Sequence, residues 1–350
     1  MAGLTGAHDM DSHDLHQAAR LGTLTEVPRD VLASARLLAR NPSGTTPLHA
    51  IARHGGIELL PPDRLTVENF TVRNDSGYTP LHLAAESGQL NKLPRELLVD
   101  SLLSLASNSG YTVYHVAAAH GHLDQIPREL LTAEAILRKN HLGNTLLHEA
   151  AENGSLDRVP AAFLTAESFR ERNLGGETVL HVAAFNGHLD QVPRALLTAD
   201  ALLQTTNAGD TVFHAAAISE HLEQIPAELL TRAHLVIASK TGFTAIHAAA
   251  ESGQLSKIPR AQLTADLLLT RNDNGDTPLH AAAHEGFLHQ VPVSLLTPET
   301  LNVRNYDGMS VGRLAVTRGY ADHIPIEYRP KQRGPIGRFL ERIGASRPPF

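Results

Sequence analysis

The sequence predicts an all-α solenoid of 33-residue helical repeats, and three regular columns of residues lead to this fold class. A proline column runs from Pro28 to Pro325 with a period of 33 residues. A leucine column, from Leu32 to Leu296, keeps the same period. Columns that share one period over many units indicate stacked repeats rather than one globular core. The third column is a histidine preceded by Leu, Tyr, Phe or Ile, at His16, His49, His82, His115, His148, His181, His214, His247 and His280.

Each repeat is predicted to open with a helix of about ten residues. In the segment 77–88, Thr79 is a good N-cap, and Pro80 suits the first helical position, where a missing N–H costs nothing. The apolar residues at positions i, i+3 and i+4 from Leu81 form one face of this helix. Gly88 favours the left-handed conformation at which helices end.

The second half of the repeat is predicted to hold a shorter helix. In the segment 123–134, Pro127 fits best at the first position of a helix that ends near Leu131. Thr132 can then cap a further helical turn, and Glu134 lies favourably near its positive end. An Arg-Asn-x-x-Gly turn returns the chain to the next repeat, as at Arg73-Asn74, Arg172-Asn173, Arg271-Asn272 and Arg304-Asn305.

The terminal units differ from the internal ones, as capping repeats should. The first lacks Thr-Pro before its histidine, and the last carries Arg313 in the histidine column. We therefore predict about eight full repeats between N- and C-terminal capping units. One internal unit also departs from the pattern, because Glu220 stands in the glycine column. A non-glycine residue there costs about 1 kcal/mol if the left-handed conformation is kept.

The motif Gly-x-Thr-Pro-Leu-His-x-Ala-Ala-x-x-Gly-His-Leu resembles that of the ankyrin repeat family. Its fullest copies are residues 77–90 and 275–288, and the resemblance extends over about residues 8–330. It implies antiparallel helix pairs stacked into a curved solenoid, whose inner helices and loops present a concave surface for binding other proteins. The chain departs from the family pattern in the second half of each repeat, where a proline-containing segment, in its fullest copies Ile/Val-Pro-x-x-Leu-Leu-Thr, replaces the usual second helix and hairpin.

We expect three regions along the chain: a flexible N-terminus (residues 1–10), the ankyrin-like solenoid (residues 11–330) and a basic amphipathic tail (residues 331–350). Three roles are open to the tail, namely covering the last repeat, docking a partner, or weak contact with an anionic membrane. Its apolar residues follow the spacing of a short amphipathic helix, at Ile336, Phe339, Leu340 and Ile343.

The composition narrows the classes of function. The absence of cysteine excludes disulfides, thiolate nucleophiles, zinc–cysteine sites and iron–sulfur clusters. A net charge of −7 disfavours a nucleic-acid partner. No apolar run approaches the length of about 20 residues that a membrane span needs, and the polar segment 1–13 does not resemble a secretory signal. We therefore predict no nucleic-acid partner, no membrane span and a cytoplasmic monomer, with delivery outside the cell as an effector left open.

The residues capable of chemistry are predicted to be structural. Stacked helices lie about 8–10 Å apart, whereas zinc ligands lie about 2.0–2.1 Å from the metal. Successive column histidines therefore cannot converge on one ion. The family resemblance implies instead that each ring bonds the threonine hydroxyl and nearby backbone at the helix start. The pair His120 and His122, with Asp124, is the remaining metal candidate, and surface turn positions are its commoner interpretation. No phosphate loop or known catalytic motif is present, so we predict no metal, no cofactor, no small-molecule ligand and no enzymatic activity.

The predicted function is a non-catalytic scaffold that binds a partner protein through the concave face and loops. The alternative is an assembly element that acts by self-association. Tyr78 and Tyr111 occupy one column in adjacent repeats, and aromatic residues are favoured interface anchors. The alternative for these tyrosines is packing on neighbouring turns with only partial exposure. The candidate partner-binding residues are Tyr78, Tyr111, His120, Leu174, Phe185, Ile218, Phe243 and His284.

Overall fold

The computed structural model describes residues 10–329, so the N-terminal segment predicted to be flexible lies almost wholly outside the described residues, and the basic tail lies entirely outside them. The chain divides into two compact units, whose described parts are residues 10–229 (unit 1) and 230–329 (unit 2). Both are built from helices, turns and isolated bridges, and no strand forms within residues 10–329. The all-α helical repeat architecture predicted from the sequence is confirmed.

Each repeat contributes one main helix, and consecutive main helices pack side by side within a unit, as α3 does with α1 and α5. In unit 1 they are α1 (Ser12–Leu21), α3 (Pro47–His54), α5 (Pro80–Glu86), α7 (Val113–Ala119), α9 (Leu146–Glu152), α11 (Val179–Asn186) and α13 (Val212–Ile218). In unit 2 they are α15 (Ala245–Glu251), α17 (Pro278–Glu285) and α19 (Val311–Thr317).

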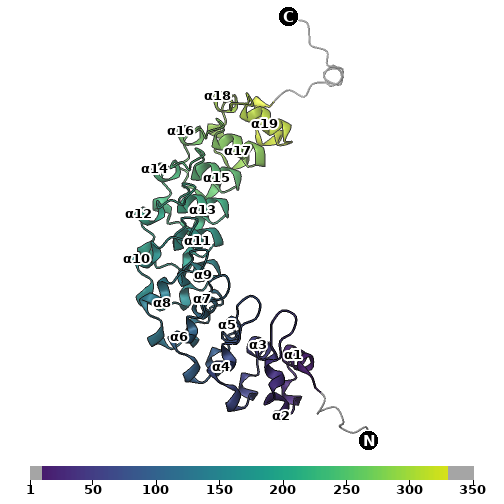
Figure 1. Ribbon diagram of the computed structural model, residues 1–350. Coiled ribbons are helices and arrows are strands. Elements are labelled where there is room, and N and C mark those ends of the chain that lie inside the picture. The colour runs from purple at the N-terminus through teal and green to yellow at the C-terminus, as the bar shows by residue number, and fades with distance from the viewer. Residues whose placement is uncertain (1–9, 330–350) are drawn as a thin grey trace, which may run out of the picture. The chain divides into compact units, whose positions relative to one another are not determined.

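A second, shorter helix follows in most repeats. Figure 1 shows α8, α10 and α12 in a row beside the main helices α9, α11 and α13 of unit 1. In unit 1 the short helices are α2 (Arg29–Leu32), α4 (Val67–Phe70), α6 (Asp100–Leu103), α8 (Ala133–Leu137), α10 (Ala166–Phe169) and α12 (Ala199–Leu202). In unit 2 they are α14 (Arg232–Leu235), α16 (Ala265–Leu268) and α18 (Pro298–Leu301).

The main helices begin as the sequence predicts, but those after α1 end sooner. Thr79 is the N-cap of α5 and Pro80 its first residue. The helix ends after seven residues because Gly88 adopts a left-handed φ of 69°. That turn directs the amide of Gln89 back to the carbonyl of Ala84, at 2.7 Å, which satisfies one of the carbonyls left unpaired at the helix end.

The second half of the repeat differs from the prediction at its proline. Pro127 is the residue before a 3₁₀ turn, η8 (Arg128–Leu130), and not its first residue, because its ψ of 126° keeps the backbone extended. A separate 3₁₀ turn, η7 (Leu123–Gln125), precedes it. Thr132 then caps α8 as predicted, since its hydroxyl accepts a hydrogen bond from the amide of Ala135 at 3.2 Å.

Tight turns connect the repeats. The amide of Asn74 donates to the carbonyl of Tyr78 at 2.9 Å, and the amide of Gly77 donates to the carbonyl of Asn74 at the same distance. In several repeats the turn is also closed by an isolated antiparallel bridge, as between Ala106 and Thr112. The chain thus keeps a short turn before each main helix, although the hairpin sequence usual in ankyrin repeats is missing.

The left-handed position at Glu220 gives a testable prediction. Glu220 has a φ of 66°, whereas the equivalent residue of other repeats is glycine, such as Gly187. We expect Glu220→Gly to raise the free energy of unfolding by about 1 kcal/mol, because glycine adopts this conformation without the cost of a Cβ. Urea unfolding followed by circular dichroism measures the change. Ser219→Gly is the control, since Ser219 has an ordinary φ of −95°; stabilisation by both variants would contradict the explanation.

Candidate partner-binding face

The column histidines hydrogen-bond to the backbone of residues at the candidate site, such as Tyr78 and Tyr111. In each of eight repeats the Nδ1 atom lies 2.7–2.9 Å from the hydroxyl of the N-cap threonine, as predicted. The Nδ1 atom of His82 also accepts a hydrogen bond from the amide of Thr79 at 3.1 Å. The proton of the neutral ring therefore resides on Nε2, which donates to the carbonyl of Tyr111 in the next repeat at 3.1 Å. These rings join neighbouring repeats as well as starting helices.

Burial keeps these rings uncharged. It lowers the pKa of His49, His82, His115, His148 and His181 from 6.5 to about 4. All five side chains lie in unit 1 and are at most 2% exposed. A second proton on Nδ1 would face the amide and hydroxyl of the N-cap threonine, which adds to the cost of charging a buried group.

In each repeat, the surface formed by the main helix and the turn before it is here called the helix–turn face. In unit 1 this face is hollowed into a groove of about 380 Å³, the tyrosine groove, which brings together three of the predicted residues. Tyr78, Tyr111 and His120 line it, with Arg53 and Glu86 at one side. Both tyrosines are half-buried, and His120 is exposed. The tyrosines therefore form one patch, and each also packs on the ring of its own repeat's histidine.

A buried carboxyl group lies beside the tyrosine groove and escaped the sequence analysis. Glu149 of α9 is only 2% exposed, and its Oε1 atom accepts hydrogen bonds from the side-chain amides of Asn140 and Asn144, at 2.9 and 3.1 Å. The hydroxyl of Tyr111 also interacts with this carboxyl group. Burial raises the pKa of Glu149 from 4.5 to about 7, because these neutral donors only partly replace water. The sequence signal was available: Glu149 is the one acidic residue among those that directly follow the column histidines.

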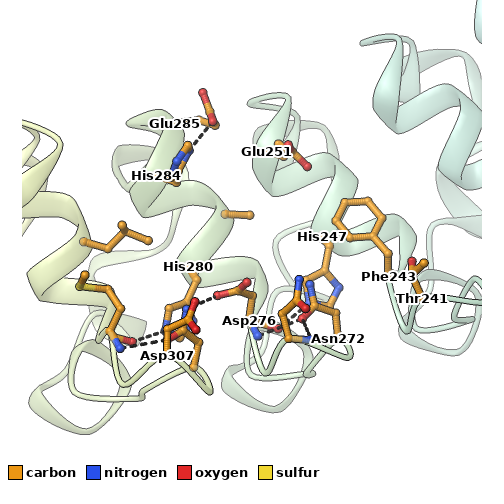
Figure 2. A pocket seen from close by; sticks show the side chains of 15 residues that line it. Thr241, Phe243, His247, Glu251, Asn272, Asp276, His280, His284, Glu285 and Asp307 are labelled. Carbon is orange, nitrogen blue, oxygen red and sulfur yellow. Dashed lines mark hydrogen bonds and ion pairs between the residues drawn. The ribbon is translucent and has the colours of Figure 1, made fainter.

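The helix–turn face of unit 2 holds a second groove, of about 470 Å³, which Figure 2 shows from close by. Its lining includes Phe243 and His284, two more of the predicted residues. Phe243 lies next to the ring of His247, with 5.4 Å between the ring centroids. His284 is near the end of α17, where it contacts Glu285 and the guanidinium group of Arg318. Four carboxylates also line this groove, those of Glu251, Asp276, Glu285 and Asp307.

The remaining three predicted residues are exposed outside these two grooves. Leu174 is 72% exposed in a turn, and Phe185 and Ile218, near the ends of α11 and α13, are 55% and 50% exposed. None of them lines the tyrosine groove or the groove of unit 2. They are accessible to a partner, but the structure does not gather them into the patches that hold the aromatic residues.

Two further observations bear on the kind of site. Within residues 10–329 no group of three His, Cys, Asp or Glu side chains is arranged to hold a metal ion. No helix in that part of the chain is both long and apolar enough to cross a membrane. The grooves on the helix–turn face present aromatic, imidazole and carboxylate groups at the surface.

Comparison with known proteins agrees with the geometry. A family model of ankyrin repeats, which spans three copies of the repeat, matches residues 15–98 and 180–261. No curated protein matches the chain. The matched ranges begin and end in the helical repeats described above, with the threonine cap, the histidine column and the left-handed glycine in phase. The repeats of residues 15–98 and 180–261 therefore belong to the ankyrin repeat family.

Proposed function

We propose that this chain is a non-catalytic scaffold that binds a partner protein through its helix–turn face. Ankyrin repeats are generally protein–protein interaction modules. The observation that carries the proposal is the tyrosine groove, where Tyr78 and Tyr111 from adjacent repeats lie together, half-exposed, in a hollow. Rigid aromatic side chains in partly desolvated pockets are the usual anchors of protein interfaces.

The use of the polar residues supports a binding role over catalysis. The column histidines and threonines hydrogen-bond each other and the next repeat, so they serve the fold. Glu149 is enclosed by Asn140, Asn144 and Tyr111. We propose further that the protein acts in the cytoplasm. Its sequence contains no cysteine and can therefore form no disulfide, and disulfides are rare in cytoplasmic proteins.

Replacing both tyrosines tests the proposal. We expect Tyr78→Ala combined with Tyr111→Ala to weaken partner binding at least tenfold, because loss of a central aromatic anchor costs more than about 1 kcal/mol. The partner is first captured from cell lysate with the wild-type chain and identified by mass spectrometry, and its affinity for each variant is then measured by calorimetry.

Tyr306→Ala is the matched control, because Tyr306 is 73% exposed in a turn of unit 2 and does not line either groove. Circular dichroism checks that the double variant remains folded. An unchanged affinity of the folded double variant would remove the tyrosine groove from the interface. A mass that rises with concentration, without capture of another protein, would favour assembly by self-association.

A further inference from the structure

The end of unit 2 carries an apolar groove that no part of the described chain covers. This end groove has a volume of about 400 Å³. Leu301 of α18, Gly312 and Val316 of α19, and Ile324 and Tyr328 beyond it line the hollow. Leu301 and Ile324 are buried, whereas Val316 is 36% and Tyr328 41% exposed. The lining also includes Pro298 and the polar residues Asn302, Ser310, Arg313 and Thr317, so the groove has an apolar floor and walls of mixed character.

Gly312 creates much of the space. It stands in the column of the residue that precedes the column histidine, where every other repeat places a large side chain. Those side chains are at most 2% exposed, at Leu48, Leu81, Tyr114, Leu147, Leu180, Phe213, Ile246 and Leu279. A Cβ atom built on Gly312 would come no closer than 3.4 Å to another atom, the carbonyl oxygen of Leu301. A Cβ atom would therefore meet only ordinary contacts at this position.

The chain leaves the described structure at the rim of this groove. Tyr328 lines it directly, and the guanidinium group of Arg329 donates hydrogen bonds to the carbonyls of Asp322 and Ile324, at 2.6 and 2.7 Å. Within unit 2, the main helix of each earlier repeat packs against that of the next, as α17 does against α19. Past α19 no further main helix follows among the described residues.

We propose that the chain's own segment 335–344 occupies the end groove. Its apolar residues, Ile336, Phe339, Leu340 and Ile343, recur at the spacing that places them on one side of a helix, opposite Arg338, Glu341 and Arg342. From Arg329 to Ile336 the chain can extend over up to about 24 Å, so the segment reaches the groove at whose rim the described chain ends. Bulky apolar side chains of this segment fill the space that Gly312 leaves. The inference concerns the end of the repeat stack and does not depend on a partner protein.

The absence of cysteine makes this proposal testable by disulfide trapping in the full chain. Val316→Cys places one thiol on the wall of the groove, and a second cysteine replaces one segment residue at a time. We expect Phe339→Cys and Ile343→Cys to form an intramolecular disulfide with position 316 about tenfold faster than Arg338→Cys and Glu341→Cys. All four positions have nearly the same tether length, so only the side that faces the groove distinguishes them.

Three outcomes would overturn the proposal. Equal rates at the apolar and polar positions would mean that the tether alone brings the thiols together. No intramolecular disulfide at any position would place the segment elsewhere. Disulfide-linked dimers at micromolar protein would identify a second copy as the occupant of the groove. Gly312→Leu is added to the Val316→Cys and Phe339→Cys pair as a further test. We expect it to slow disulfide formation about tenfold, because the leucine side chain fills the end groove beside position 312. An unchanged rate would also contradict the assignment.

Discussion

Mild acidification is expected to unfold unit 1. Five buried histidines, His49, His82, His115, His148 and His181, have a folded-state pKa of about 4 against 6.5 for an unperturbed ring. Between these values the unfolded chain binds protons that the folded chain does not. Stability is therefore complete above pH 6.5 and is lost as the pH falls towards 4.

The expected loss of stability is large because all five rings oppose folding over the same pH range. Each ring costs about 1.4 kcal/mol for each pH unit in this window, so five rings cost about 7 kcal/mol per unit. Glu149 opposes them, since its raised pKa makes the folded state the better proton binder between pH 4.5 and 7, but it is one group against five. With a typical total stability of about 5–15 kcal/mol, the midpoint of acid unfolding should fall between about pH 4 and 5.5.

Urea unfolding at intervals from pH 4.5 to 8, followed by circular dichroism, measures this dependence. His115→Gln should make the dependence shallower by the contribution of one ring, while lowering stability at pH 8 through its lost hydrogen bonds. His141→Gln is the control, because His141 is exposed, and it should leave the slope unchanged. A stability that stays flat from pH 6.5 to 4.5 would mean that the buried rings are not the groups that titrate.

Neutralising Glu149 is expected to stabilise the protein above pH 7. The folded-state pKa of Glu149 is about 7 against an ordinary value of 4.5, so ionisation of this buried carboxyl opposes folding. At pH 8 the ionised carboxyl group of Glu149 therefore lowers the free energy of unfolding by on the order of 3 kcal/mol. Glu149→Gln keeps an oxygen that can accept the hydrogen bonds of Asn140 and Asn144 and removes the charge. It should restore most of that stability.

The pH profile distinguishes this cause from a general gain in packing. The gain from Glu149→Gln should be present at pH 8 and vanish below about pH 4.5, where the wild-type carboxyl group is already protonated. Glu251→Gln removes the same charge from an exposed position at the end of α15 in unit 2 and should change stability by less than about 0.5 kcal/mol. Equal gains at pH 8 and pH 4.5 would contradict the role assigned to ionisation.

The parts of the structure that follow from local chemistry could be predicted from the sequence. A threonine, a proline and a histidine at fixed spacing define the helix start at Thr79, and the glycine that ends the helix at Gly88 is equally local. Pro127 was misplaced by one position because proline fixes φ but leaves ψ free, and ψ decides whether it begins a helix or precedes it.

The contacts between neighbouring repeats could not be predicted from the sequence. The bond from the Nε2 atom of His82 to the carbonyl of Tyr111 joins residues 29 positions apart and depends on how the repeats stack. The contact between the carboxyl group of Glu149 and the hydroxyl of Tyr111 likewise joins two neighbouring repeats. The sequence predicts Tyr78, Tyr111, His120 and Leu174 as candidates for one binding surface. Only the three-dimensional arrangement separates the first three from Leu174, which lines neither groove.

The bond that a column histidine makes to the next repeat does not depend on the side chain of the acceptor residue. In seven repeats the acceptor is a main-chain carbonyl, and the residue that carries it differs from repeat to repeat: Tyr78, Tyr111, Asn144, Glu177, Asp210, Asp276 and Met309. An aromatic ring, an amide, a carboxylate or a thioether can thus be exchanged at this position while the underlying bond is preserved. The surface that a partner would contact can therefore be changed one repeat at a time, while the hydrogen bonds that join the repeats are kept.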